Sequence, residues 1–327
     1  MNLVSSEAAL DFTKLRIESE DQTQIFYNRY NNILSGLDES ELETLKDSIV
    51  IVVPGFLGEW LQNIQGYLSP LKIWLNKKAI PYVVVETNSN KTSEENAVKI
   101  REQIKTAAKT KKKIYILAHS RGGLDTLLAL TENRPQAKIS GVILIQSPIY
   151  GTWISDAVSK WCQEWKDTFF AETEVAATDC MQKVISLSGG KSKAKEMLAG
   201  LWDTILAMKS LERGQWMKAH QDKLYELFHK EGIPLLSIVT KDEGATFRFT
   251  PYEVFRRKMW GINISNDGVV PSSSMKVPGT SFVFLQENAD HSTLVEKHEQ
   301  KSFFQSRVLE TAFDLVVDGS LSKFSID

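Results

Sequence analysis

Residues 114–123 read Ile-Tyr-Ile-Leu-Ala-His-Ser-Arg-Gly-Gly. The uncharged, apolar run 114–118 predicts a buried strand, and the apolar residues that follow at helical spacing predict a helix. Ser120 then lies on a sharp turn between strand and helix, where its backbone is strained and its Oγ is exposed. The flanking positions, Ala118 and Gly122, must be small because strand and helix pass closely there. This pattern predicts a nucleophilic serine; the alternative is a serine that only caps an ordinary crossover helix.

Five further short apolar runs are typical of strands in a parallel sheet that is covered on both faces. They span residues 48–53, 82–85, 142–145, 235–239 and 281–285. Helical patterns over residues 59–77 and 93–110 separate the first three runs, and this alternation favours right-handed crossovers between parallel strands. The predicted fold class is therefore α/β, with a mainly parallel sheet and helices on both faces.

The spacing of the runs breaks between Ile145 and Leu235, an interval far longer than one crossover helix requires. Apolar residues recur there at helical spacing, and we expect a helical cap. Five of the eight tryptophans fall in this interval: Trp153, Trp161, Trp165, Trp202 and Trp216. The predicted organisation is a lead-in segment, an inserted cap and a core in two pieces: residues 1–47, 152–231, and 48–151 with 232–327.

The composition excludes several classes of protein. The 39 lysines and arginines and 41 aspartates and glutamates leave a formal net charge of −2. No attraction to nucleic acid is expected, because such proteins usually carry a basic domain or stripe. Cys162 and Cys180 are too few for a disulfide scaffold or a cysteine-rich zinc module. Without a phosphate-binding glycine loop or a His-Glu-x-x-His motif in the sequence, no cofactor and no metal is expected.

Targeting signals are equally scarce. The first seven residues, Met-Asn-Leu-Val-Ser-Ser-Glu, form neither the basic nor the apolar region of a secretory signal. No window reaches about 18 apolar residues, so no membrane-spanning segment is expected. A cytoplasmic location is the default expectation, with export without a cleaved signal, or a trimmed chain, as the alternatives.

The elbow Ala-His-Ser-Arg-Gly resembles that of a subset of bacterial lipases in the α/β-hydrolase superfamily, and it is similar to the elbow of some polyhydroxyalkanoate depolymerases. The resemblance covers about residues 48–318 and is weakest in the predicted cap. It implies an α/β-hydrolase fold and a serine hydrolase that cleaves carboxylic esters through an acyl-enzyme on Ser120. The catalytic residues of this fold follow the chain order serine, acid, histidine.

Acyl transfer builds negative charge on the carbonyl oxygen, and backbone N–H donors must stabilise it. In this fold one donor is the residue after the nucleophile, here Arg121, and the other lies in the loop after an early strand. The loop after strand 48–53 resembles the lipase His-Gly-x loop, which implies Phe56 as the second donor, although Pro54 stands where lipases often carry histidine. Leu57 beside it is a candidate substrate contact. The alternative is a glycine turn that merely reverses the chain.

His291 is selected as the general base by elimination among five histidines. It follows the last predicted strand in a polar loop, from which a base can reach Ser120 Oγ. His119 is expected to point away from the nucleophile and is a candidate substrate contact. Some lipases carry calcium near the histidine loop, but the matching loop pattern is absent around Asp290 and no metal is predicted. The other histidines lie in the inserted region or the terminal helix: His220, His229 and His298.

Asp267 is the preferred acid. It lies in the run Asn-Asp-Gly-Val-Val-Pro, before the last predicted strand. The run Asp-Gly-Val-Val-Pro-Ser resembles the lipase acid loop, whereas nothing around the alternative, Asp242, does so. The acid would fix the tautomer of His291 and stabilise its imidazolium form without taking the proton.

Residues 146–152 are similar to the lipase segment that opens the cap and lines the acyl site, although a simple proline-glycine turn would read the same. Tyr150 and Trp153 are therefore candidate substrate contacts. Together with the tryptophan-rich cap, they predict an apolar acyl ester as substrate, a lipid first and a polyhydroxyalkanoate second, and the cap could contact a lipid interface. An acyltransferase or thioesterase is the main alternative, and a non-catalytic binding protein is the least favoured.

Overall fold

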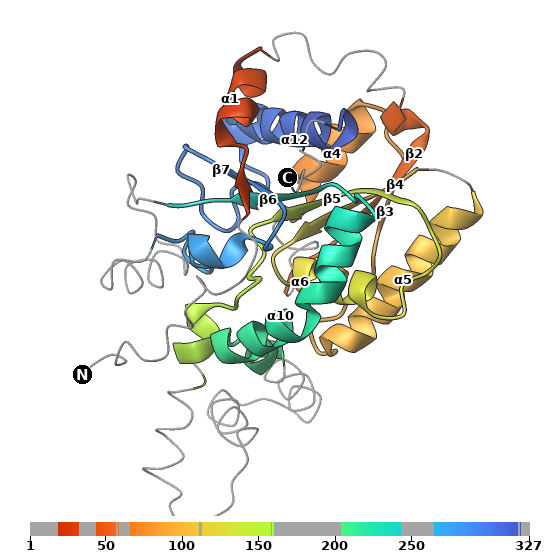
Figure 1. Cartoon of the computed structure of the whole chain (residues 1–327). Coiled ribbons are helices and arrows are strands. Elements are labelled where there is room, and N and C mark those ends of the chain that lie inside the picture. The colour runs from red at the N-terminus through yellow and green to blue at the C-terminus, as the bar shows by residue number, and fades with distance from the viewer. Residues whose placement is uncertain are drawn as a thin grey trace, which may run out of the picture.

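A seven-stranded sheet forms the centre of the structure, which is a computed structural model (Figure 1). The structure describes residues 19–32, 44–56, 58, 66–110, 113–157, 159, 204–242, 265–319 and 321. Within them the strand order is β1-β7-β6-β5-β4-β2-β3, and every neighbouring pair is parallel. The strands are β1 (Glu20–Asp21), β2 (Ser48–Val53), β3 (Tyr82–Val84), β4 (Lys113–His119), β5 (Ile139–Ile145), β6 (Leu235–Val239) and β7 (Ser281–Phe284).

The six strands predicted from apolar runs are confirmed, and β2 and β6 begin and end at the predicted residues. The seventh strand, β1, lies in the segment that the sequence marked only as a lead-in. It pairs with β7 through Glu20 opposite Ser281 and Asp21 opposite Phe282. A strand of two residues gives no periodic signal, which explains why the sequence did not predict it.

Helices cover both faces of the sheet, as predicted (Figure 1). One face carries α1 (Thr23–Asn32), α4 (Ser69–Lys77) and α12 (Ser302–Val317), with α12 in contact with the other two. The other face carries α5 (Ser93–Lys109), α6 (Arg121–Thr131) and α10 (Ser210–Tyr225), with α6 in contact with the other two. Shorter helices include the π-helix η3 (Glu226–Lys230) and the 3₁₀-helices η4 (Ser272–Met275) and η5 (Glu299–Lys301).

Helix boundaries follow local chemistry. α5 begins where the sequence predicts because Thr92 and Glu95 form a capping box, in which each side chain accepts a hydrogen bond from the other residue's backbone N–H. The helix predicted over residues 59–77 is observed from Ser69 as α4, and residues 59–65 lie outside the described part of the chain.

Alternate residues of each strand pack into different halves of the core. In β2, Val50 and Val52 are buried in the cluster that contains Trp74 of α4, whereas Ile51 and Val53 are buried in the cluster against α5 and α6. Each fully buried aliphatic side chain contributes about 1.5–3 kcal/mol of transfer free energy. Because both faces are buried, the strands read as continuous apolar runs.

The predicted cap is described only near its two ends. Residues 160–203 lie outside the described part, and with them Cys162, Cys180 and three of the tryptophans. The described remainder is mainly helical, and α10 packs against α6. The cap and the domain boundaries therefore stay predictions. Over the portions of the chain that can be assessed, no helix has the length and apolar character needed to cross a membrane.

The parallel arrangement brings the candidate site together, because all strands end at the same edge of the sheet and ligands of open α/β sheets bind at that edge. The loop of Phe56 follows β2, and Ser120 follows β4 directly. Gln146 follows β5, Asp267 lies between β6 and β7, and His291 comes after β7.

Candidate active site

Ser120 lies on a strained elbow between β4 and α6, as its sequence context predicts. Its φ and ψ angles are 52° and −129°, a combination that is costly for a residue with a side chain and persists where the surroundings impose it. The Ser120 N–H donates to the carbonyl of Ile145 at 2.9 Å, which ties the elbow to β5. A Cβ at Gly122 would lie 2.5 Å from the carbonyl oxygen of Pro54, so this position admits only glycine.

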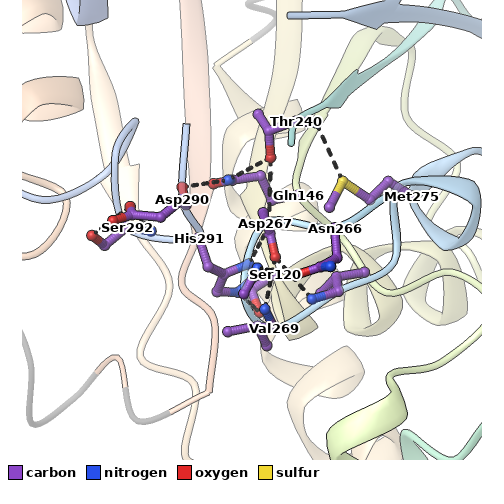
Figure 2. Close-up of polar contacts among 12 residues, drawn as sticks. Ser120, Gln146, Thr240, Asn266, Asp267, Val269, Met275, Asp290, His291 and Ser292 are labelled. Carbon is purple, nitrogen blue, oxygen red and sulfur yellow. Dashed lines mark hydrogen bonds and ion pairs between the residues drawn. The ribbon is translucent and has the colours of Figure 1, made fainter. Parts of the chain in front are cut away.

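The side chain of His291 lies within hydrogen-bond distance of Ser120 on one side and of Asp267 on the other, in the order that the sequence predicts (Figure 2). His291 Nε2 is 2.9 Å from Ser120 Oγ, and His291 Nδ1 is 2.7 Å from Asp267 Oδ2. All three side chains are buried, and Asp267 is completely inaccessible. The distances are those that a nucleophile, a general base and an orienting acid require.

Hydrogen bonds to both carboxylate oxygens orient the side chain of Asp267. Its Oδ1 accepts hydrogen bonds from the N–H groups of Val269 and Val270, at 2.9 and 2.8 Å (Figure 2 shows the former). An ionised carboxylate can only accept, so His291 Nδ1 carries the proton that points at Oδ2. Nε2 is then the unprotonated nitrogen and accepts the hydrogen bond of the Ser120 hydroxyl. This is the tautomer that a general base needs before reaction.

The structure distinguishes between the two candidate acids by position. Asp242 stands just after β6, and its backbone N–H donates to the Asn266 carbonyl at 2.8 Å. Asp267 reaches His291 with its carboxylate, and its backbone carbonyl also accepts from the His291 N–H at 2.9 Å. The preferred residue is thus bound to the histidine loop through both side chain and backbone.

Asp290 fixes the loop that carries His291. Its Oδ1 accepts hydrogen bonds from the Ser292 N–H, the Ser292 hydroxyl and the Thr293 hydroxyl, at 3.0, 2.9 and 2.8 Å. Burial alone would raise the pKa of Asp290, but these bonds outweigh it and leave the pKa below its ordinary value. Among the described residues no group of three or more His, Cys, Asp and Glu side chains could hold a metal ion.

The loop after β2 is pressed against the elbow. A Cβ at Gly55 would lie 2.8 Å from Ser120 Cβ, so glycine permits this approach. Within the described residues, the N–H groups of Phe56 and Arg121 donate to no protein group. Arg121 is the first residue of α6, where N–H groups and the helix dipole favour negative charge. Leu57, the candidate substrate contact in this loop, lies outside the described residues.

His119 has both ring nitrogens within hydrogen-bond distance of protein groups. Nδ1 is 2.9 Å from the hydroxyl of Tyr67, and Nε2 is 3.1 Å from the backbone carbonyl of His291. Burial, and after it repulsion from His291 when that ring is protonated, lowers the pKa of His119 well below its ordinary value. The predicted substrate contact of His119 stays a prediction, and the observed contacts are to the two neighbouring loops.

The other two candidate substrate contacts lie beyond β5. Tyr150 is buried, and its N–H donates to Ser274, to the carbonyl at 3.2 Å and the hydroxyl at 3.1 Å. Burial raises the pKa of the Tyr150 phenol. Trp153 begins a short helical segment and is half-buried. Their contact with substrate stays a prediction.

Three residues of the site were not singled out from the sequence: Tyr67, Gln146 and Thr240. Gln146 Nε2 donates to the Asp290 carbonyl at 2.8 Å and to Thr240 Oγ1 at 2.7 Å (Figure 2). Gln146 and Thr240 directly follow β5 and β6, so their position at the carboxyl edge of the sheet was a usable signal. Tyr67 precedes α4 and carries no such signal.

The chain is similar to known proteins in its structure and not in its sequence. No family model matches the chain, and no curated protein matches it. A metagenomic carboxyl esterase aligns with a TM-score of 0.57 at 17% identity, over 86% of this chain and 77% of that one. The mature lipase BlEst2 from Bacillus licheniformis aligns with a TM-score of 0.56 at 12% identity, over 80% of this chain and 92% of that one. Lipase 1 from Pelosinus fermentans aligns with a TM-score of 0.53 at 14% identity, over 86% of this chain and 100% of that one.

These similar structures are lipases and carboxyl esterases, which belong to the α/β-hydrolase superfamily. At such low identity the similarity shows the fold. The parallel sheet, the helices on both faces and the elbow at Ser120 agree with it. The chain therefore has the α/β-hydrolase fold, and the prediction of its fold class is confirmed.

Proposed function

We propose that the protein is a serine carboxylic-ester hydrolase that acts on a lipid or another apolar acyl ester through an acyl-enzyme on Ser120. The observation that carries this proposal is the continuous set of contacts from Asp267 through His291 to a serine on a strained elbow. These contacts fit a serine hydroxyl that gives its proton to a histidine oriented by a carboxylate.

In the first half of the reaction, Ser120 Oγ attacks the acyl carbon of the ester while its proton passes to His291 Nε2. The carbonyl oxygen becomes an oxyanion and accepts hydrogen bonds from the N–H groups of Phe56 and Arg121. The bond from the acyl carbon to the alcohol oxygen then breaks, and the proton on Nε2 goes to the departing alcohol. The product is an acyl ester of Ser120.

In the second half, water replaces the alcohol. His291 Nε2 takes one proton from the water as its oxygen attacks the acyl carbon, and the same two donors bind the second oxyanion. The bond to Ser120 Oγ then breaks, and the proton on Nε2 returns to that oxygen. The acyl group leaves as a carboxylic acid, and the resting state is restored.

The remaining residues assist without changing bonds. Asp267 keeps the Nδ1 proton in place and stabilises the imidazolium that forms twice in each cycle. A preorganised oxyanion donor contributes about 2.7–4 kcal/mol to the stability of the transition state. The N-terminus of α6 adds favourable potential at the same oxygen.

An apolar acyl group is proposed on two grounds. The sequence between β5 and β6 is rich in tryptophan, and this segment follows Tyr150 and Trp153 at the edge where the site lies. The similar solved structures include a carboxyl esterase and two lipases, proteins that act on esters. Hydrolysis is preferred to acyl transfer because water needs no acceptor site.

The test is hydrolysis of p-nitrophenyl esters from acetyl to palmitoyl by the wild type and by Ser120→Ala, measured side by side. We expect turnover with an optimum at medium or long chains in the wild type and almost complete loss in the variant. A circular dichroism spectrum of Ser120→Ala, expected to match the wild type, shows that the loss is chemical.

The other possible results would each contradict one part of the proposal. Equal rates in the two proteins would exclude Ser120 as nucleophile, and no hydrolysis of any ester by the wild type would exclude an ester hydrolase. An optimum at acetyl without activity on long chains would exclude the apolar substrate. Faster release of product when an alcohol acceptor is added, with little hydrolysis in its absence, would favour the acyltransferase.

A further inference from the structure

The hydroxyl of Tyr67 lies between two parts of the site that the mechanism uses separately. It accepts a hydrogen bond from the N–H of Gly55 at 2.7 Å, and Gly55 directly precedes the oxyanion donor Phe56. The same hydroxyl is 2.9 Å from Nδ1 of His119. On its other side, His119 Nε2 is 3.1 Å from the backbone carbonyl of His291. One path of hydrogen bonds thus joins the loop of Gly55 and Phe56 to the backbone of the loop that carries His291.

The protons of this path follow once burial keeps His119 neutral. The Gly55 N–H can only donate, so the Tyr67 oxygen accepts there. The carbonyl of His291 can only accept, so His119 Nε2 carries the proton on its ring. In the neutral ring Nδ1 is then the acceptor, and the Tyr67 hydroxyl donates to it.

The surroundings favour this neutral form. Tyr67 and His119 are buried, with 3% and 5% of their surface exposed, and their rings meet edge to face with centroids 5.6 Å apart. The ring of His291 lies beyond, with its centroid 4.9 Å from that of His119. Burial lowers the pKa of His119, and repulsion from His291 adds to this whenever that ring is protonated, so His119 stays neutral across the neutral pH range.

We propose that Tyr67 and His119 are positioning residues, which hold the peptide before the Phe56 donor and the loop of His291 in fixed relation to Ser120. The proposal rests on the proposed function, because the positions matter only if Phe56 and His291 act on the same acyl group. Oxyanion contacts strengthen in the transition state. Loss of the path should therefore lower kcat and leave KM almost unchanged.

Tyr67→Phe removes the hydroxyl and keeps the ring. It leaves the Gly55 N–H and His119 Nδ1 without this partner, so the Phe56 donor is held less well. We expect kcat to fall about 10-fold, less than the loss on deleting an oxyanion donor itself. The matched control is Tyr115→Phe, which removes a hydroxyl from an equally buried tyrosine in the middle of β4 and should leave kcat unchanged.

Two variants at His119 separate the two ends of the path. The amide of His119→Gln can donate near the position of Nε2 but offers no acceptor near Nδ1, and His119→Asn does the reverse. Because Tyr67→Phe already abolishes the contact at Nδ1, adding His119→Gln should cost nothing further, whereas adding His119→Asn should lower kcat again. Such non-additivity identifies residues that act as one unit.

The measurements are kcat and KM on a p-nitrophenyl ester, the acid limb of the kcat/KM profile, and the rate of inactivation by a p-nitrophenyl phosphonate. In Tyr67→Phe we expect kcat and the inactivation rate to fall together, with KM and the acid-limb pKa unchanged. Thermal melts show whether each variant folds. If Tyr67→Phe does not fold, the same measurements are made on His119→Gln.

The proposal is overturned if Tyr67→Phe keeps the wild-type kcat, if Tyr115→Phe loses as much, or if KM rises while kcat stays. A shift of the acid limb in His119→Gln would also contradict it, because His119 would then titrate with the base. Ser120→Ala is included to separate the two proposals. If that variant keeps full activity, it is the proposed function that fails.

Discussion

The proposed site has a base side and an oxyanion side, and the residues of the two sides are held in place by different means. On the base side, the reacting groups are side chains, and hydrogen bonds to the carboxylate of Asp267 and the ring of His291 fix them directly. On the oxyanion side, the proposed donors are backbone N–H groups, which close packing at Gly55 and Gly122 and the hydroxyl of Tyr67 hold in place. Ser120 stands between the two sides.

This difference predicts where mutations act on chemistry and where they act on position. A change on the base side removes a group that moves or orients a proton. A change on the oxyanion side leaves every reacting group present but displaces it. Losses on the base side should therefore be larger, and losses on the oxyanion side should follow the size of the displacement.

The largest effect is expected where the two sides meet. Ser120→Ala and His291→Ala should each lower kcat on the order of 10⁶-fold, and the double variant should lose little more, because the pair acts as one unit. Steady-state hydrolysis of a p-nitrophenyl ester measures all three proteins. A double variant much weaker than either single variant would show that the two residues act independently.

Asp267→Asn tests the base side alone. The amide can present an N–H to His291 Nδ1 and favours the wrong tautomer, so we expect kcat to fall about 10⁴-fold with little change in folding. Asp242→Asn is the matched control and should keep the wild-type kcat. If Asp242→Asn loses more activity than Asp267→Asn, the acid has been assigned to the wrong residue.

Gly55→Ala tests packing on the oxyanion side. The new Cβ would lie 2.8 Å from Ser120 Cβ and 3.1 Å from His119 Nδ1, so the loop must move away from the elbow. We expect kcat to fall about 10²–10³-fold, as for the loss of an oxyanion donor. Gly319→Ala, where an added Cβ meets nothing within 4 Å, should leave kcat unchanged. Equal kcat in both variants would contradict the role of packing.

The smallest effect is a pH dependence of stability. The pKa of His119 is lowered below its ordinary value of 6.5 in the fold, so below pH 6.5 the unfolded chain binds a proton that the native state does not. Wild-type unfolding free energy should therefore fall as the pH drops below 6.5, by at most about 1.4 kcal/mol per pH unit from this group. Urea denaturation of His119→Gln should show a shallower slope; an identical slope would contradict the assignment.

Much of the fold could be predicted because burial on both faces leaves a strong signal. The runs that became β2 and β6 are continuous and apolar, and the structure bounds them at the same residues. β1 was not predicted, because Glu20 and Asp21 are polar and pair only at the edge of the sheet. A polar pair whose pairing depends on a strand far along the chain has no local signature.

The residues of the site also fall into those that the sequence predicts and those that it does not. Ser120 could be predicted because the elbow requires small residues beside it, and His291 because it stands in a polar loop after the last strand. Asp267 was predicted because its run resembles the lipase acid loop. Tyr67 could not be predicted, because its contribution depends on Gly55 and His119, which come from other elements. A sequence shows which residues bear chemistry more readily than which residues hold them.

The central claim is that Ser120 is a nucleophile activated by His291, and covalent labelling tests it most directly. The wild type is treated with a fluorophosphonate, and the modified peptide is identified by mass spectrometry, with Ser120→Ala and His291→Ala treated alongside. We expect one adduct per chain, on Ser120, absent in Ser120→Ala and formed far more slowly in His291→Ala. An adduct on another residue, the same labelling in Ser120→Ala, or no labelling of the wild type would contradict the account.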